Sequence, residues 1–427
     1  MAKELYEFEP AFRTAADKCL AALPDETRTK VYELLFGAET QAENGLEMER
    51  PSLLLPTLFV VEYSLAETIR SFGVEPDAML GHSLGEYVAA TLGGTWTLEQ
   101  VLPVLVLRGE CMELSAAGAV VSVSLPAAEI QALGDAELSL SAANAPELSA
   151  VAGSPFAIER FEQSLKDRDV DFQRLRIGVG AHSHLLDSVL DRFREGLEQF
   201  TPEPAKKLWV SNVTGEWIDA QRAADRDYWV EHLRSTVRFE DGVSTLLDGG
   251  DRVFVEVGPG KALTSLVRMH ERARNSSALV TVPHPNDEKP ADSFLLEAIG
   301  RLWQVGVPID WQAFHGGVKR RRVALPTYAF QRQRYWIEPG TSLGHDNLVA
   351  NNEPTVPTRL PDSQWLKKTV WRAREVSSKV EPAANAHWLC VGGGAVAAAL
   401  ASKVRAAGGK ATVVTAIAAQ DHGTAER

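Results

Sequence analysis

Apolar residues at helical spacing open the chain. They recur at every fourth position, with mostly polar residues between them, at Phe8, Phe12, Ala16 and Leu20. This spacing predicts helices over residues 1–35. A second helix is predicted over residues 51–72, where Pro51 stands near the start and an apolar run at 58–65 follows.

A short apolar strand at 78–80 leads into the turn Gly81-His82-Ser83-Leu84-Gly85, and a helix is predicted from Glu86. Strand, glycine-flanked turn and helix in this order are typical of an α/β unit. Two further strands are predicted at 208–210 and 253–257. The hydrophobic pattern therefore predicts an α/β fold.

Residues 118–182 follow a pattern of their own, in the order strand, helix, strand, strand, helix, strand. These elements are predicted at 119–125, 127–133, 138–143, 149–153, 156–168 and 172–179. The order is that of a ferredoxin-like subdomain. We expect this subdomain to be inserted in the larger α/β domain.

The later part of the chain is divided by linker-like composition. Residues 283–290 are rich in proline and charge, a helix is predicted at 291–305, and residues 339–362 are rich in Gly, Asn and Pro. A strand, a triple-glycine turn, a helix and a strand follow at 388–391, 392–394, 395–407 and 411–414. The turn lacks the G-x-G-x-x-G spacing of a dinucleotide-binding loop, because residue 397 is Ala, so a structural βαβ fragment is predicted.

Composition places the chain among globular proteins. Its 427 residues suggest two to three domains, and 45% hydrophobic with 24% charged residues excludes wholesale disorder. The net charge of -13 argues against a nucleic-acid-binding scaffold. We therefore interpret the basic run at 319–322 as a solvated face.

Cysteine usage and segment lengths narrow the class further. Cys19, Cys111 and Cys390 are odd in number and far apart, which excludes a disulfide framework and a cysteine-built zinc site. No apolar run approaches the ~18 to 20 residues needed to span a bilayer, and the N-terminus lacks the plan of a signal peptide. We expect a soluble, cytoplasmic protein with no metal site, no nucleic-acid partner and no membrane association.

The turn at 81–85 fits the nucleophile elbow G-x-S-x-G. A serine between a strand and a helix exposes its hydroxyl, and the free N–H groups at the helix N-terminus can stabilise an oxyanion. Ser83 is therefore predicted to be a nucleophile, with a purely structural turn as the alternative.

A serine nucleophile needs a base. His182 stands at the end of the last predicted strand of the inserted subdomain, where it can face a cleft between subdomains; His184 is its nearest rival, and a surface histidine is the alternative. Arg108 follows the apolar stretch at 101–107. It is either an ordinary surface arginine or a bidentate clamp for a substrate carboxylate, and the pattern alone leaves both open.

Residues 1 to about 275 resemble the acyltransferase domain of modular type I polyketide synthases. The matching segments include GHSLGEYVAA (81–90), Arg108-Gly109, HSHLLD (182–187), SNVTG (211–215), YWVEHL (228–233) and EVGPG (256–260). Residues 291–338, with GVPIDW and LPTYAFQRQRYWIE, look like the linker after that domain. The resemblance implies an acyltransferase domain at 1–280 with its insert at about 118–182, a post-acyltransferase linker at 281–340, a flexible linker at 341–364 and the start of a ketoreductase-like structural region at 365–427.

The resemblance also implies a fold and an activity. The fold would be an α/β-hydrolase-like core with the ferredoxin-like insert, followed by a partial Rossmann-like βαβ segment. The family moves a malonyl or substituted malonyl group from coenzyme A, through a seryl ester, to the phosphopantetheine arm of an acyl carrier protein. No cofactor would be bound covalently in this chain, and its partners would be the carrier protein and the ketosynthase and ketoreductase domains of the same synthase.

Site residues follow from the same resemblance. Ser83 would be the nucleophile, His182 its general base, and Arg108 the partner of the extender carboxylate. The backbone N–H of Leu84 would be an oxyanion donor, and His82 a lesser member of the substrate site together with Asn144. Residues Val179, Gly180 and Ala181 precede the base and are expected to shape the extender pocket.

Three departures from the family pattern bear on activity. The chain begins just after the position of the family's G-Q-G-x-Q loop, and loss of that oxyanion donor would reduce the rate on the order of a hundredfold. Leu55 stands where a glutamine commonly precedes the proline, and the residues ending at His182 read VGAH where H-A-F-H or Y-A-S-H is common. The extender is therefore undecided between malonyl, methylmalonyl and other substituted malonyl groups.

Two other functions stay open on the sequence. One is a serine hydrolase, an esterase or thioesterase that uses the same elbow. However, α/β hydrolases place an acidic residue and then a histidine late in the chain, whereas His182 belongs to an inserted unit. The other is an inactive, truncated fragment of a synthase, which the absent N-terminal loop would support.

Overall fold

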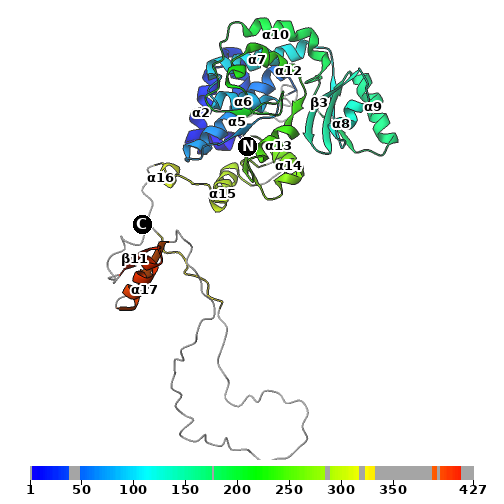
Figure 1. Cartoon of the computed structure of the whole chain (residues 1–427). Coiled ribbons are helices and arrows are strands. Elements are labelled where there is room, and N and C mark those ends of the chain that lie inside the picture. Colours follow the sequence, from blue (N-terminus) through cyan, green and yellow to red (C-terminus); the bar gives the residue numbers. More distant parts are fainter. Residues whose placement is uncertain are drawn as a thin grey trace, which may run out of the picture. The chain divides into compact units, whose positions relative to one another are not determined.

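Helices build the first part of the chain, as its hydrophobic pattern predicts (Figure 1). The computed structural model describes residues 2–37, 49–175, 177–283, 289–316, 323–331, 387–391 and 395–414. The chain divides into two units, Met1–Ala324 and Leu325–Arg427, which are described separately. The opening helices of the first unit are α1 (Ala2–Phe8), α2 (Pro10–Ala21), α3 (Asp25–Phe36) and α5 (Pro51–Ser71).

Helix α5 is the central helix of this part. It packs against α2 and against α7 (Leu98–Leu114). A Cβ added at Gly109 of α7 would overlap the backbone of Ser52, so the close approach of α7 to α5 requires glycine there. The carboxylate of Glu113 accepts a hydrogen bond from the Ser52 N–H at 2.9 Å, which satisfies a free donor in the first turn of α5.

By length and composition α5 is able to cross a membrane, which corrects the expectation that no apolar run reaches that length. The helix joins shorter apolar runs through single polar residues, among them Thr57 and Ser64, which are buried in the unit. Of its most apolar window, 67% is buried inside the first unit. Such burial is what the core helix of a globular domain shows.

Short parallel strands form the α/β part of the first unit. Strand β1 (Met79–Leu80) pairs with β6 (Trp209–Val210), and β8 (Val253–Glu256) pairs with β9 (Ser277–Val280). Helix α6 (Leu84–Leu92) follows β1 and begins two residues earlier than predicted. The predicted strands at 78–80, 208–210 and 253–257 are thus confirmed with slightly shorter bounds.

The strands of the inserted subdomain belong to a five-stranded sheet in the order β5-β2-β4-β3-β7. Figure 1 labels β3 of this sheet together with the helices α8 and α9. Strands β5, β2, β4 and β3 run antiparallel to their neighbours, and β7 joins parallel to β3. This confirms the predicted ferredoxin-like order of elements. The bounds are β2 (Ala119–Val123), α8 (Ala127–Ala132), β3 (Leu138–Ala145), β4 (Leu148–Gly153), α9 (Pro155–Asp167), β5 (Phe172–Arg174) and β7 (Val237–Arg238).

The last strand of this subdomain is shorter than predicted. It ends at Arg174 instead of residue 179, and Val179 makes only an isolated bridge with Ala117. The two chain segments cross there so closely that a Cβ on Gly118 would overlap the backbone of Gly180. His182 consequently lies in a turn and not at a strand end, which corrects the placement expected from the sequence.

The remaining elements of the first unit are short helices. They are η1 (His184–Val189), α10 (Leu190–Leu197), α11 (Ala220–Ala223), α12 (Arg226–Arg234), α13 (Phe239–Leu247), α14 (Ala262–Met269), η2 (Glu271–Ala273), α15 (Ala291–Gln304) and α16 (Trp311–Phe314). Helix α15 confirms the helix predicted at 291–305. The backbone N–H of Ala291, the first residue of α15, donates to the carboxylate of Glu4 in α1 at 2.7 Å.

The second unit contains a strand-helix-strand fragment. Strands β10 (His387–Val391) and β11 (Lys410–Val414) pair in parallel, and α17 (Ala395–Ala406) lies between them in sequence. The predicted strand, helix and strand are confirmed. The triple-glycine turn at 392–394 and the linker predicted at 341–364 lie outside the described residues.

Candidate active site

The nucleophile elbow places Ser83 in a strained backbone conformation. Its φ of 52° and ψ of -105° are unusual for a residue with a side chain. Ser83 is the N-cap of α6, so its hydroxyl lies between strand β1 and the helix N-terminus. A Cβ at Gly81 would overlap the backbone of Gly85 and Glu86, which explains the first glycine of the motif, whereas the nearest atom to a Cβ at Gly85 is 3.9 Å away.

His182, the predicted base, lies beside this serine. Its Nε2 lies 2.7 Å from Ser83 Oγ, and its Nδ1 lies 2.8 Å from the backbone carbonyl oxygen of Ser235. The carbonyl can only accept, so Nδ1 carries the proton and Nε2 is free to accept the serine proton. His184, the rival, lies apart from the serine, with its Nδ1 2.8 Å from Ser139 Oγ.

The surroundings of His182 favour its neutral form. Burial lowers the pKa of this imidazole well below 6.5, and the nearby Arg108, His232 and His82 lower it further. The acceptor at Ser235 opposes them only weakly. A neutral imidazole is the form that a general base requires.

Arg108 completes the centre from helix α7. Its Nη2 donates to Ser83 Oγ at 2.9 Å, and its side chain is 1% exposed. Among the described residues, no hydrogen-bond partner lies near its Nε or Nη1, although both atoms are buried. The guanidinium also lies over the Tyr87 ring, 5.2 Å from its centroid. The interpretation of Arg108 as a surface arginine is thus wrong, because the side chain is buried. A buried cation with free donors is suited to bind an anionic group.

Two further predicted residues contact one another. Nε2 of His82 lies 2.8 Å from Oδ1 of Asn144, which ties the elbow to strand β3 of the ferredoxin-like subdomain. Leu84 is the first residue of α6, so its backbone N–H has no acceptor within the helix. Its role as an oxyanion donor stays a prediction.

The residues before His182 line the same turn. Val179 and Ala181 are half-buried and pack against the main core, and the Ala181 carbonyl accepts a hydrogen bond from Ser141 Oγ at 2.8 Å. A Cβ on Gly180 would approach Leu185 Cδ1 to 2.5 Å. Their neighbourhood to the base is confirmed, and their role in an extender pocket stays a prediction.

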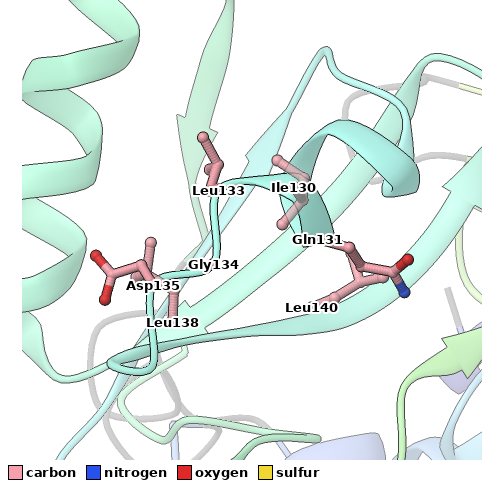
Figure 2. A pocket seen from close by; sticks show the side chains of 7 residues that line it. All are labelled: Ile130, Gln131, Leu133, Gly134, Asp135, Leu138 and Leu140. Atoms are coloured by element: carbon pink, nitrogen blue, oxygen red, sulfur yellow. The ribbon is translucent and has the colours of Figure 1, made fainter.

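Other concave features lie away from this centre. A cavity of about 190 Å³ between α8 and β3 is lined by residues such as Ile130 and Leu140, with Asp135 at its edge (Figure 2). Asp135 is paired with Arg160 at 2.8 Å. Within the described part of the chain, no group of three or more His, Cys, Asp or Glu side chains is placed to hold a metal ion.

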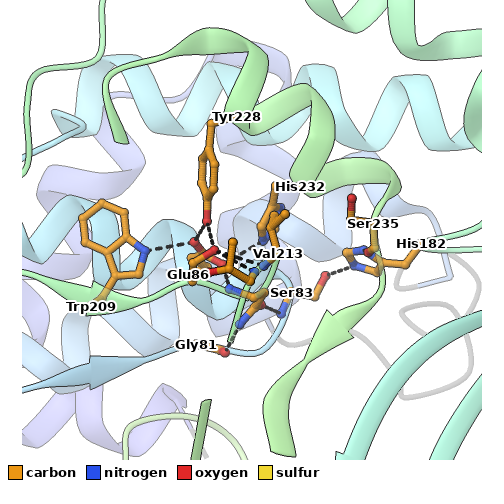
Figure 3. A network of polar contacts seen from close by, with 12 residues as sticks. Gly81, Ser83, Glu86, His182, Trp209, Val213, Tyr228, His232 and Ser235 are labelled. Atoms are coloured by element: carbon orange, nitrogen blue, oxygen red, sulfur yellow. Dashed lines mark hydrogen bonds and ion pairs between the residues drawn. The ribbon is translucent and has the colours of Figure 1, made fainter. Parts of the chain in front are cut away.

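A buried polar network lies beside the elbow (Figure 3), and the sequence pattern did not single it out. Its centre is the fully buried carboxylate of Glu86. The donors to Glu86 are Trp209 Nε1 at 2.9 Å, the Asn212 N–H at 2.8 Å and the Tyr228 hydroxyl, and His232 Nε2 lies at 3.2 Å.

This network keeps Glu86 ionised. Burial alone would raise the pKa of the carboxyl, but the nearby His232 and the donors Tyr228 and Trp209 outweigh it and lower the pKa below its ordinary value. All these residues except Trp209 lie in the segments GHSLGEYVAA, SNVTG and YWVEHL, which could have indicated them. The Ser235 acceptor had no such signal, because every residue has a carbonyl group.

The family model for the acyl transferase domain matches residues 1–307. The chain belongs to this acyltransferase family. The resemblance seen in the sequence is confirmed.

Relatives of the acyltransferase are polyketide synthases. The chain is 34% identical over 395 residues to a phenolphthiocerol/phthiocerol polyketide synthase polypeptide of Mycobacterium tuberculosis, covering 92% of this chain and 26% of that protein. It therefore spans about a quarter of the length of that curated relative.

Two solved acyltransferase structures share its fold. The acyl transferase domain of ZmaA is 36% identical, with a TM-score of 0.70 and 76% of each chain covered. The acyl transferase domain of SpnD, in complex with 2-(pent-4-yn-1-yl)malonyl, is 38% identical, with a TM-score of 0.67 and 72% of this chain and 73% of that chain covered. The α/β fold predicted from the sequence is thus that of polyketide synthase acyltransferase domains.

Proposed function

We propose that this chain transfers a malonyl or substituted malonyl group from coenzyme A, through an ester at Ser83, to the phosphopantetheine thiol of an acyl carrier protein. The observation that supports this best is the position of Ser83 Oγ, 2.7 Å from His182 Nε2 and 2.9 Å from Arg108 Nη2. A base and an unpaired buried cation meet at one nucleophile. This arrangement suits a substrate that has both a thioester and a carboxylate.

The first half-reaction uses the neutral histidine. His182 Nε2 takes the hydroxyl proton of Ser83 as Oγ attacks the thioester carbonyl, and the Leu84 N–H stabilises the oxyanion that forms. The tetrahedral intermediate collapses when the C–S bond breaks, and the imidazolium returns the proton to the coenzyme A thiolate. The second half-reaction repeats these steps with the carrier thiol as nucleophile, and Ser83 is regenerated.

Arg108 would select the substrate. Nε and Nη1 are buried and have no hydrogen-bond partner among the described residues, so the guanidinium still has donors for the free carboxylate of a malonyl group. A bidentate contact would use Nη2 together with one of these two nitrogens and would neutralise the charge. An acetyl group has no carboxylate and leaves the guanidinium unpaired. The undecided choice between malonyl, methylmalonyl and other substituted malonyl groups would depend on the space near Val179, Gly180 and Ala181.

The wider assignments rest on the family and belong to the same proposal. The core would be α/β-hydrolase-like, and the β10-α17-β11 fragment would be the start of a Rossmann-like ketoreductase region. The partners would be an acyl carrier protein and the ketosynthase and ketoreductase domains of a cytoplasmic synthase. Membership in a family whose relatives are polyketide synthases supports these assignments.

Labelled malonyl-CoA tests the proposed activity. The full chain should become labelled, Ser83→Ala should not, and His182→Ala should label at a greatly reduced rate, with all three proteins folded by circular dichroism. Rapid release of free malonate would indicate a serine hydrolase instead. No reaction by the folded chain would favour an inactive fragment.

A further inference from the structure

The side chain of Asn212 bridges two backbone groups of the elbow. Its Oδ1 accepts the Ser83 N–H at 2.7 Å, and its Nδ2 donates to the Gly81 carbonyl at 2.8 Å. This amide orientation is the one that satisfies both backbone groups. Asn212 is 1% exposed, so both hydrogen bonds are shielded from water.

The two bridged groups, the Gly81 carbonyl and the Ser83 N–H, lie on either side of His82, and Ser83 is the residue with the strained backbone. A positive φ at a residue other than glycine is unfavourable and persists only where neighbouring contacts enforce it. Asn212 supplies such contacts from a loop more than a hundred residues away in the chain. It also occupies the Ser83 N–H, which leaves the Leu84 N–H as the donor available at this helix end.

Glu86 connects Asn212 back to the elbow helix. Its Oε2 accepts the backbone N–H of Asn212 at 2.8 Å, while Oε1 accepts from Trp209 and Tyr228 (Figure 3). Glu86 lies one helical turn after Ser83. Helix α6 therefore holds the loop that carries Asn212, and Asn212 in turn holds Ser83, the N-cap of the same helix. The contacts form a closed ring from Ser83 to Glu86 to Asn212 and back.

We propose that Asn212 is a positioning residue that holds Ser83 in its reactive conformation, and that Glu86 sets the place of Asn212. The proposal builds on the acyl transfer proposed above. Asn212 itself makes no contact with the reacting hydroxyl. Its effect should appear in the rate of bond formation at Ser83 and not in the binding of malonyl-CoA, because Asn212 contacts only backbone groups of the elbow, whereas the carboxylate would bind to Arg108.

Asn212→Ala is the first test variant, measured in the full chain. We expect single-turnover acylation by malonyl-CoA to slow about tenfold to a hundredfold, with the half-saturating concentration changed by less than about threefold. Labelling of Ser83 by a fluorophosphonate, which needs only a reactive serine, should slow as well. If the fluorophosphonate labels the unchanged chain but malonyl-CoA does not, the proposed function fails while the role of Asn212 is still tested.

Thr245→Val is the matched control. Thr245 donates through Oγ1 to the Gly215 carbonyl at 2.5 Å, so the variant removes a hydrogen bond from the same loop without touching the elbow. We expect it to acylate at the rate of the unchanged chain. The proposal is overturned if Asn212→Ala acylates normally, or if the two variants lose rate in proportion to their loss of melting temperature.

The pH dependence of Asn212→Asp distinguishes the positioning role from a purely structural one. A protonated aspartic acid can still accept from the Ser83 N–H and donate to the Gly81 carbonyl, whereas an ionised one places negative charge against that carbonyl. The rate of the variant relative to the unchanged chain should therefore fall as the pH rises from 5 to 8. A ratio that does not change with pH overturns the proposal, even if Asn212→Ala fails to fold.

Discussion

At the scale of single residues, burial keeps His182 in the state that the chemistry needs. The pKa of its imidazole is lowered well below 6.5, mainly by burial and then by Arg108 and its histidine neighbours. His182 is therefore still neutral at pH values where an exposed histidine would be protonated.

The pH dependence of acylation should show this shift. We expect the single-turnover rate with malonyl-CoA to stay flat from pH 8 down past pH 6.5 and to decline only below it, because only then does His182 gain a proton. Quenched-flow measurement of Ser83 labelling at each pH is the test, and a half-maximal rate near pH 6.5 would contradict it. The unfolded chain binds this proton at higher pH than the folded chain. The free energy of unfolding should therefore decrease as the pH is lowered from 6.5.

Arg108 should determine the class of substrate. In Arg108→Ala, malonyl transfer should fall roughly tenfold to a hundredfold, since a hydrogen bond to a charged group contributes about 1.5–3 kcal/mol. Acetyl transfer should be spared, and Arg108→Lys should recover only part of the malonyl rate because an ammonium cannot form the bidentate contact.

A competition assay with malonyl-CoA and acetyl-CoA measures this selectivity. The melting temperature is the control: it should not drop, because a buried guanidinium with unpaired donors is itself costly in free energy. Equal loss of both activities would place Arg108 outside the substrate site.

At the scale of elements, the two glycines of the elbow are not equivalent. In the sequence motif Gly81 and Gly85 look alike. In the structure a Cβ at Gly81 would overlap the backbone of Gly85 and Glu86, whereas a Cβ at Gly85 meets nothing closer than Glu62 Oε2 at 3.9 Å.

Gly81→Ala and Gly85→Ala form a matched pair of variants. We expect Gly81→Ala to abolish labelling by malonyl-CoA and to lower the melting temperature, because the turn must open to admit the methyl group. Gly85→Ala should keep both properties, since it lies in α6 and alanine favours a helix by about 1 kcal/mol over glycine. Similar behaviour of the two variants would show that the elbow is not held by this close packing.

The sequence predicts the elements that form through contacts between residues close in the chain, and it misses features that depend on contacts between distant segments. Alternating and helical apolar patterns predicted the ferredoxin-like unit, α5 and β10-α17-β11, because these patterns are local. The predicted end of β5 was wrong because the strand's course depends on the close contact of Gly118 with Gly180, which lie in segments distant in the sequence. Ser83 and His182 followed from a motif and a resemblance, whereas the acceptor for His182 is a backbone carbonyl and leaves no trace in the residue type.

At the scale of the whole molecule, the candidate active-site residues named above all belong to the first unit. Ser83, His182, Arg108 and the network around Glu86 all lie within Met1–Ala324, and the family model ends at residue 307. Helix α15 is part of this unit as well: its Leu295 and Ile299 lie in the same core cluster as Leu5 of α1. The first unit therefore contains both the proposed catalytic groups and its own core.

A chain that ends after Ala324 should fold and acylate on its own. Domains with their own core fold independently in most cases, so we expect the acylation rate to stay within about threefold of the full chain. A second truncation, after Pro290, removes α15 and exposes the apolar side of α1, and it should lower the melting temperature or prevent folding. Labelling by malonyl-CoA and thermal unfolding of the two truncated chains measure both expectations. Loss of labelling in a folded chain ending at Ala324 would mean that residues of the second unit contribute to the active site.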